Sequence, residues 1–314
     1  MARWHHAAGR AAVLAGLAGF LAVGFVGVYG YVENYWLFRG FSAPHDPVWV
    51  DTRGTVVHLR VTSAALGGRA QPVDVYLPPG YAAHPNRRYP VLYLLHGEPG
   101  RPAAFLDTVR MGVVEDELTA LHRARPIILV MPFGSTGSFT DKEWANGIRP
   151  HQGWETFVAR DVVDAVDARF RTIRARSARG IAGLSEGGYG AINIAIHHPG
   201  EFGLVESWSG YETADPLRSI FGRSTKLLRW NTPLDTLPAA AALLRRDRTF
   251  FWIYTGRDDH FAPQNVAFAA LLAREHLRYR FRLLNGGHNW ALWRGNAADA
   301  YLAASEHLRT GLAA

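Results

Sequence analysis

Ser185 stands in the setting that most clearly indicates chemistry. Residues 183–187 have the sequence Gly-Leu-Ser-Glu-Gly, a G-x-S-x-G pattern that follows a short apolar run and precedes further glycines. In a nucleophile elbow the serine occupies a strained turn between a strand and a helix, so the residues two before and two after it must be small. The pattern predicts a serine nucleophile that attacks an acyl carbon. A purely structural Gly/Ser turn is the alternative.

A base and an acid follow the serine in the chain order Ser, Asp, His that accompanies such elbows. His288 lies on a glycine-flanked loop directly after an apolar run, a setting that favours a functional over a packing role. We expect His288 to take the proton of Ser185 and to pass it to the leaving group. The acid that orients this histidine is Asp259 or its neighbour Asp258, and we favour Asp259.

Two backbone N–H groups are needed to stabilise the tetrahedral oxyanion. One should belong to Glu186, directly after the nucleophile, and the other to the glycine loop at residues 96–100. In that loop Glu98 is the candidate, because Pro99 has no N–H to donate. His96 precedes the glycine of this loop, and we expect it to be structural.

Carboxylates beside a developing negative charge oppose catalysis unless they point away or meet a cation. One interpretation is that these side chains face solvent or form structural salt bridges. The other is that Glu98 and Glu186, with Asp141 or Glu143, hold a positive group of the substrate. A free α-amino group on the acyl part would supply that charge, which favours an aminoacylated phospholipid as substrate.

The elements that must position these residues alternate along the chain. Short apolar runs are typical of buried strands, and helix-like stretches cover 154–170 and 189–197. This alternation predicts a mainly parallel central sheet with helices on both faces, and together with the nucleophile elbow and the order Ser, Asp, His it indicates an α/β-hydrolase fold. The runs fall at 91–95, 127–131, 180–184, 204–208, 250–254 and 279–284, whereas 56–61 and 73–77 alternate like the strands of a half-exposed antiparallel hairpin.

The combined motifs resemble the esterase D-like branch of α/β-hydrolases, which includes S-formylglutathione hydrolases, feruloyl esterases and mycolyltransferases. The matching segments are VDVYLPPGY (73–81), YPVLYLLHG (89–97), GLSEGGYGA (183–191), YTGRDD (254–259) and GGHNWALW (286–293). The resemblance covers about residues 55–305 and implies that Asp259 is the acid. Family members often carry Met at position 186 and an apolar residue at position 98, so the two glutamates are departures.

The N-terminus predicts a membrane anchor. Residues 11–32 contain no charged side chain, and these 22 residues as a helix would span about 33 Å, enough for a bilayer core of roughly 30 Å. A cleaved signal peptide is the alternative, but bulky aromatics stand where a cleavage site needs small residues. Arg3 and Arg10 precede the helix and favour a cytoplasmic N-terminus.

We therefore expect a single-pass protein of the cell membrane with an extracytoplasmic catalytic domain. Residues 1–10 would be cytoplasmic, 11–32 transmembrane, 33–50 a tether and 51–314 catalytic, with 211–248 as a cap-like insertion. Competing interpretations are an acyltransferase acting on an envelope lipid or sugar, and an inactive lipid- or envelope-binding protein.

Composition excludes several classes of site. The chain has no cysteine, so disulfides, thiolate metal sites and a cysteine nucleophile are ruled out. Its net charge of +7 comes from basic residues scattered among acids, without the basic runs of nucleic-acid-binding proteins. The histidines at 5–6, 151 and 197–198 lack partners at metal-ligand spacing. We expect no metal, no organic cofactor and no nucleic-acid partner.

Overall fold

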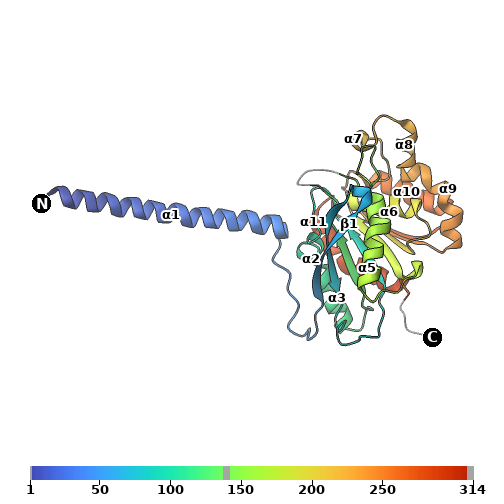
Figure 1. Ribbon diagram of the computed structural model, residues 1–314, viewed down its shortest axis with the longest axis horizontal. Helices are drawn as coiled ribbons and strands as arrows, with labels where there is room; N and C mark the ends of the chain where they lie inside the picture. The colour runs from blue at the N-terminus through green and yellow to red at the C-terminus, as the bar shows by residue number, and fades with distance from the viewer. Residues whose placement is uncertain (1, 137–141, 310–314) are drawn as a thin grey trace. The chain divides into compact units, whose positions relative to one another are not determined.

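The computed structural model describes residues 2–136 and 142–309, and it divides into two compact units, 1–43 and 44–314. The first unit consists mainly of α1 (Ala2–Phe38), drawn in blue in Figure 1. Within the described residues α1 contains the one helical stretch, Val13–Phe38, that is long and apolar enough to cross a membrane. The helix thus continues past residue 32, where the sequence suggested that it would stop.

The second unit is built on one eight-stranded sheet with the order β1-β2-β4-β3-β5-β6-β7-β8. β1 is antiparallel to β2 and β2 to β4, whereas β3 to β8 run parallel to their neighbours. This confirms the predicted α/β-hydrolase fold. The strands are β1 (Thr55–Ser63), β2 (Arg69–Leu77), β3 (Val91–Leu95), β4 (Ile128–Pro132), β5 (Arg179–Leu184), β6 (Leu204–Trp208), β7 (Phe250–Gly256) and β8 (Arg278–Leu284).

Helices cover both faces of this sheet (Figure 1), because the strands from β3 to β7 are buried along their whole length and present apolar side chains on each side. One core lies under α4 (Trp154–Thr156), the π-helical turn Phe157–Val162, α5 (Val163–Arg169), α6 (Glu186–His197), α9 (Pro233–Arg246) and α10 (Ala262–Arg274). The other lies under α2 (Ala104–Asp107), α3 (Met111–Ala120), α11 (Trp290–Gly295) and α12 (Ala297–His307).

The segment 211–248 lies between β6 and β7 and contains α7 (Arg218–Phe221), α8 (Thr225–Trp230) and α9. α9 packs on the main core through Leu237, Ala241 and Leu244. α7 and α8 instead contribute to a separate small apolar cluster that also contains Tyr189 of α6. Only the first part of this segment therefore packs apart from the main core.

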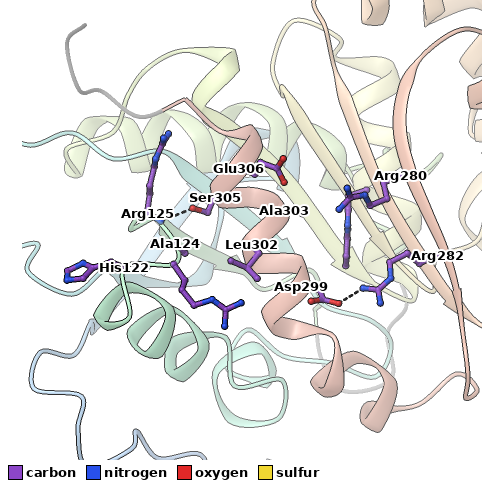
Figure 2. Close-up of a pocket in the computed structure, with 12 residues that line it drawn as sticks. His122, Ala124, Arg125, Arg280, Arg282, Asp299, Leu302, Ala303, Ser305 and Glu306 are labelled. Carbon is purple, nitrogen blue, oxygen red and sulfur yellow. Dashed lines mark hydrogen bonds and ion pairs between the residues drawn. The ribbon is translucent and has the colours of Figure 1, made fainter.

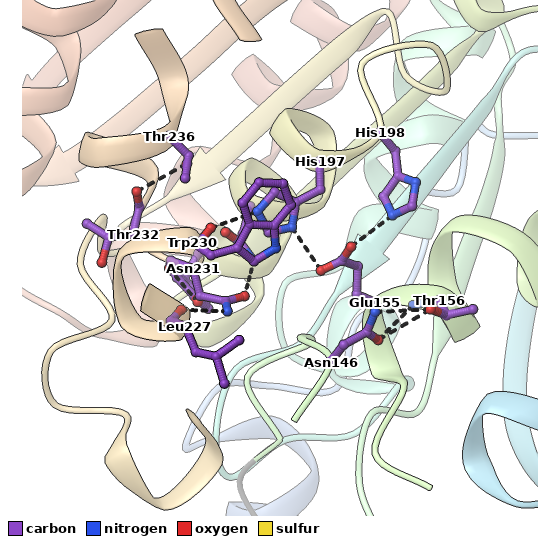
Figure 3. A network of polar contacts seen from close by, with 12 residues as sticks. Asn146, Glu155, Thr156, His197, His198, Leu227, Trp230, Asn231, Thr232 and Thr236 are labelled. Atoms are coloured by element: carbon purple, nitrogen blue, oxygen red, sulfur yellow. Dashed lines mark hydrogen bonds and ion pairs between the residues drawn. The ribbon is translucent and has the colours of Figure 1, made fainter. Parts of the chain in front are cut away.

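A buried carboxylate joins α4, α6 and α8 (Figure 3). Glu155 accepts hydrogen bonds from His197 Nδ1 at 3.0 Å and from His198 Nε2 at 2.9 Å. The other nitrogen of His197 bonds the carbonyl of Trp230 at 2.8 Å, and the two rings stack. Burial alone would raise the pKa of Glu155, but the hydrogen bonds to both histidines outweigh it and lower that pKa to about 2.

We predict that Glu155→Gln weakens the fold at neutral pH and that this loss shrinks in acid. Because the pKa of Glu155 is lower in the folded state than in the unfolded state, its ionisation stabilises the fold fully at pH values above the ordinary pKa of 4.5. This stabilisation is lost as the pH falls toward the folded-state pKa of about 2. The shift corresponds to about 3 kcal/mol of unfolding free energy. Urea unfolding at pH 7 and at pH 3 measures it, with the exposed Glu306→Gln as control. Equal loss at both pH values would contradict this assignment.

Candidate active site

Ser185 sits at the junction of β5 and α6 in a backbone conformation that side chains rarely adopt, with φ +55° and ψ −122°. Its N–H donates to the carbonyl of Trp208 at 3.0 Å, which holds the turn against β6. A Cβ at Gly187 would lie 1.8 Å from the carbonyl oxygen of Leu95, so only glycine fits there. The turn thus has the local geometry of a nucleophile elbow.

His288 links the serine to an acid. Its Nε2 lies 2.9 Å from Ser185 Oγ, and its Nδ1 lies 3.0 Å from Asp259 Oδ2. Because the Asp259 carboxylate can only accept, Nδ1 carries the proton and Nε2 is left to accept from the serine. The arrangement can therefore move the Ser185 proton to His288 while the carboxylate stabilises the imidazolium that forms.

The loops after β7 and β8, which carry the acid and the histidine, are held together by their backbones. The N–H of Arg257 donates to Leu284 O at 2.7 Å, and the N–H of Asp258 donates to Gly286 O at 3.0 Å. The two chains approach so closely that a Cβ on Gly256 would lie 2.0 Å from Gly286 O. This backbone pairing fixes the relative positions of the acid and the histidine before any side-chain contact is made.

The structure distinguishes the two neighbouring aspartates. The Asp259 side chain is fully buried, whereas Asp258 is exposed. Burial would raise the pKa of Asp259, but hydrogen bonds with His288 and with the N–H of Phe261 at 2.9 Å outweigh it, so the pKa lies below its usual value. Asp259 is therefore the carboxylate, ionised at neutral pH, that faces the histidine.

The loop after β3 passes directly beside the serine. A Cβ on Gly97 would lie 3.0 Å from Ser185 Cβ, so the backbone around Gly97 and Glu98 lines the space next to the nucleophile. His96 anchors this loop from below. Its Nε2 accepts from the N–H of Gly134 at 3.1 Å and its Nδ1 lies 3.0 Å from Gly97 O. Burial lowers the pKa of His96 to about 4, so the ring is neutral and structural.

The other acidic residues singled out from the sequence differ in their accessibility. Glu186 and Glu143 are 3% exposed, whereas Glu98 is half-buried. Glu143 accepts a short hydrogen bond from the hydroxyl of Tyr211. That tyrosine ring packs against Phe261, and Phe261 in turn packs against His288. Asp141 lies outside the described residues.

Several neighbours of the histidine were not identified from the sequence. Phe261 and His260 follow Asp259 on the same loop, and both rings pack within about 5 Å of the His288 ring, with centroids at 5.3 and 5.2 Å. Glu212 is wholly buried, and burial together with the nearby charge of Asp259 raises its pKa well above the usual value. In the sequence, only the position of Glu212 four residues after the predicted strand 204–208 indicated that it could lie near the site.

One group of side chains in the described part of the chain could hold a metal ion. One ligand atom from each of Asp259, His260 and His288 lies within 4.8 Å of the others. The sequence predicted no metal site, because the other histidines lack partners at metal-ligand spacing. Asp259 and His260 are adjacent, but His288 joins them only through the fold.

Two hollows of the described chain lie away from the serine. One, of about 820 Å³, is lined by α12, by the loop before β4 and by Arg280 and Arg282 of β8 (Figure 2). The other, of about 960 Å³, is formed by α8 and the start of α9 around Trp230. Since neither is lined by Ser185, Asp259 or His288, neither defines the space in which an acyl group would react.

Residues 63–303 match the family described as putative esterase. An esterase of Mycobacterium tuberculosis is 35% identical over 165 residues, which are 52% of this chain and 34% of that protein. An endo-1,4-beta-xylanase/feruloyl esterase of Xylanibacter ruminicola is 32% identical over 146 residues, 46% of this chain and 20% of the relative. The chain thus spans about a third or less of the length of these relatives.

A solved ferulic acid esterase superposes with a TM-score of 0.71 and 25% identity, covering 82% of this chain and 100% of that structure. The family match and this structural similarity cover most of the second unit. They confirm the resemblance to feruloyl esterases and their relatives that the five sequence motifs indicated.

We predict that Gly187→Ala disrupts the elbow, because the added Cβ would meet the Leu95 carbonyl, a backbone atom of a central strand that cannot move aside. The thermal unfolding midpoint should fall by on the order of 5 °C, and labelling of Ser185 by a fluorophosphonate probe should be lost. Gly200→Ala is the control, since nothing lies within 4 Å of a Cβ there. Unchanged labelling of the Gly187 variant would show that the close approach is wrong.

Proposed function

We propose that this chain, which belongs to the putative esterase family, is a serine hydrolase of carboxylic esters that works through an acyl-enzyme. The observation that carries the proposal is the position of His288, which bridges Ser185 Oγ and Asp259 Oδ2 at 2.9 and 3.0 Å. A histidine that contacts both a strained serine and a buried carboxylate is arranged for nucleophilic catalysis.

The proposed reaction begins when Ser185 Oγ attacks the ester carbonyl and its proton passes to His288 Nε2. The tetrahedral oxyanion accepts hydrogen bonds from the backbone N–H groups of Glu186 and Glu98, the first at the start of α6 and the second in the loop beside the serine. His288 then protonates the leaving alcohol as the C–O bond breaks. Water, deprotonated by the same histidine, hydrolyses the acyl-enzyme and regenerates the serine.

As substrate we propose an ester whose acyl part carries a positive charge, with an aminoacylated phospholipid as the specific candidate. Support comes from the acids around the nucleophile, Glu98 and Glu186 next to the oxyanion donors and Glu143 behind Tyr211. Asp141 belongs to the same proposal on its sequence position alone. Glu98, which is half-buried, is more accessible than Glu186 and Glu143 and is the first to be tested.

We further propose that α1 anchors the chain in the cell membrane, with the N-terminus cytoplasmic and the catalytic unit outside. The apolar stretch Val13–Phe38 has sufficient length for this role. Mass spectrometry of the protein purified from membranes tests it, because a signal peptide would be missing from the mature chain. Retention of residues 1–38 supports the anchor, and their removal overturns it.

We predict that Asp259→Asn lowers kcat/KM for p-nitrophenyl acetate by about 100- to 10,000-fold, because an amide can no longer hold the imidazole in the required tautomer. Asp258→Asn is the matched control on the adjacent, exposed position and should remain within about threefold of the parent. Ser185→Ala should abolish turnover. A larger loss in the Asp258 variant than in the Asp259 variant would reverse the assignment.

The substrate proposal is tested with two esters that differ only in the amine, the p-nitrophenyl esters of alanine and of propionic acid. Glu98→Gln should lower the ratio of their kcat/KM values, alanine over propionate, by about tenfold, because the amide keeps the backbone N–H but loses the charge. Alanyl-phosphatidylglycerol, with Ser185→Ala as control, then tests the lipid itself. An unchanged ratio would argue against the cation site, and transfer of the acyl group to an added sugar would identify an acyltransferase.

A further inference from the structure

His260 extends the hydrogen-bonded pair of Asp259 and His288 toward solvent. Its Nδ1 lies 3.7 Å from Asp259 Oδ1, on the opposite oxygen of the carboxylate from the one that faces His288. Its side chain is 66% exposed, while that of His288 is 20% exposed and that of Asp259 is fully buried. One ligand atom of each of these three side chains lies within 4.8 Å of the other two. The group therefore extends from the exposed His260 to the less exposed His288.

These residue types and distances suit one class of ion. Zinc is bound by histidine nitrogen and carboxylate oxygen at about 2.0–2.2 Å, so ligand atoms on a tetrahedral zinc lie roughly 3.3 Å apart. The observed separations are 3.0 Å between Asp259 and His288 and 3.7 Å between Asp259 and His260. These distances are to different oxygens of Asp259, and the three ligand atoms lie within 4.8 Å of one another, so binding requires the exposed His260 ring to move inward by up to about 1.5 Å.

We propose that Asp259, His260 and His288 form an inhibitory zinc site, in which water from the open side supplies the fourth ligand. Asp259 binds through its carboxylate, and both histidines bind through Nδ1. Magnesium and calcium, which prefer oxygen ligands, are not expected to occupy it.

The inhibition follows from the two nitrogens of one ring. A neutral imidazole has one lone pair for bonding, and the pair on Nε2 must remain free to accept the Ser185 proton. When zinc bonds Nδ1, the proton of the neutral ring resides on Nε2. That nitrogen then donates rather than accepts, so Ser185 loses its base. Zinc is neither consumed nor oxidised, and its removal restores the original tautomer.

This inference rests on the proposed function only for its effect on turnover, so binding and activity are measured separately on the full chain in non-ionic detergent. Zinc binding is followed by competition with a chromogenic chelator, which requires no enzymatic activity. Ser185→Ala should bind zinc like the parent. If no ester is cleaved but this zinc is bound, the proposed function fails while the metal site stands.

His260→Gln removes one ligand of the proposed site. The matched control is His84→Gln, which removes an exposed histidine elsewhere. Each variant is compared with its own zinc-free rate of p-nitrophenyl acetate hydrolysis, and thermal unfolding checks that it folds. We expect the zinc concentration for half-inhibition to rise by about tenfold or more in His260→Gln and to stay unchanged in His84→Gln. EDTA should restore the rate, and magnesium should not inhibit.

The titration also accounts for zinc bound elsewhere. Other histidines, including the pair at residues 5–6, add binding events that are the same in the parent, in Ser185→Ala and in His260→Gln. The proposal requires one site that is present in the parent and in Ser185→Ala and weakened in His260→Gln. Equal binding and equal inhibition in the parent and His260→Gln would overturn it, as would inhibition by magnesium at the same concentration.

Discussion

The strained turn at Ser185 is the constraint on which the rest of the site depends. Its positive φ is held because β5, β6 and the following helix leave the backbone no alternative, with the Ser185 N–H bonded to Trp208 and Gly187 pressed against the Leu95 carbonyl. Such strain is stable only when the surrounding structure over-determines it. The fully buried central strands supply that rigidity, so Ser185 is positioned by the core rather than by a mobile loop.

The acid and the histidine obey a second constraint, because a buried carboxylate must be hydrogen-bonded to stay ionised. Asp259 meets it through His288 on one oxygen and the N–H of Phe261 on the other. Glu212 lies near Asp259, and burial together with the charge of Asp259 raises the pKa of Glu212 well above its usual value. Both carboxyl groups are desolvated, but the hydrogen bonds made by Asp259 lower its pKa, whereas the pKa of Glu212 rises.

Most of the fold and the order of the site residues could be predicted from the sequence, because both produce local sequence patterns. Short apolar runs, and alternation in the first two strands, predicted all eight strands to within a few residues, and the G-x-S-x-G motif predicted the elbow at Ser185. Burial of Glu212 and the closeness of His260 to His288 could not be predicted, because they arise when separate loops meet at the strand ends. Spacing along the chain carries no information on such contacts.

α6 connects Ser185 to the segment that contains α8 and the start of α9. The helix begins directly after Ser185 and ends at His197, which bonds both Glu155 and the carbonyl of Trp230. Tyr189, one turn into the same helix, bonds the Asn231 carbonyl at 2.8 Å, so α6 holds the junction of α8 and α9 at two points. The segment between β6 and β7 is therefore fixed to the element that presents the serine. Any movement of α8 relative to α6 would have to break these two bonds, and the Glu155 carboxylate, whose pKa is lowered to about 2, holds the His197 ring in place across the neutral range.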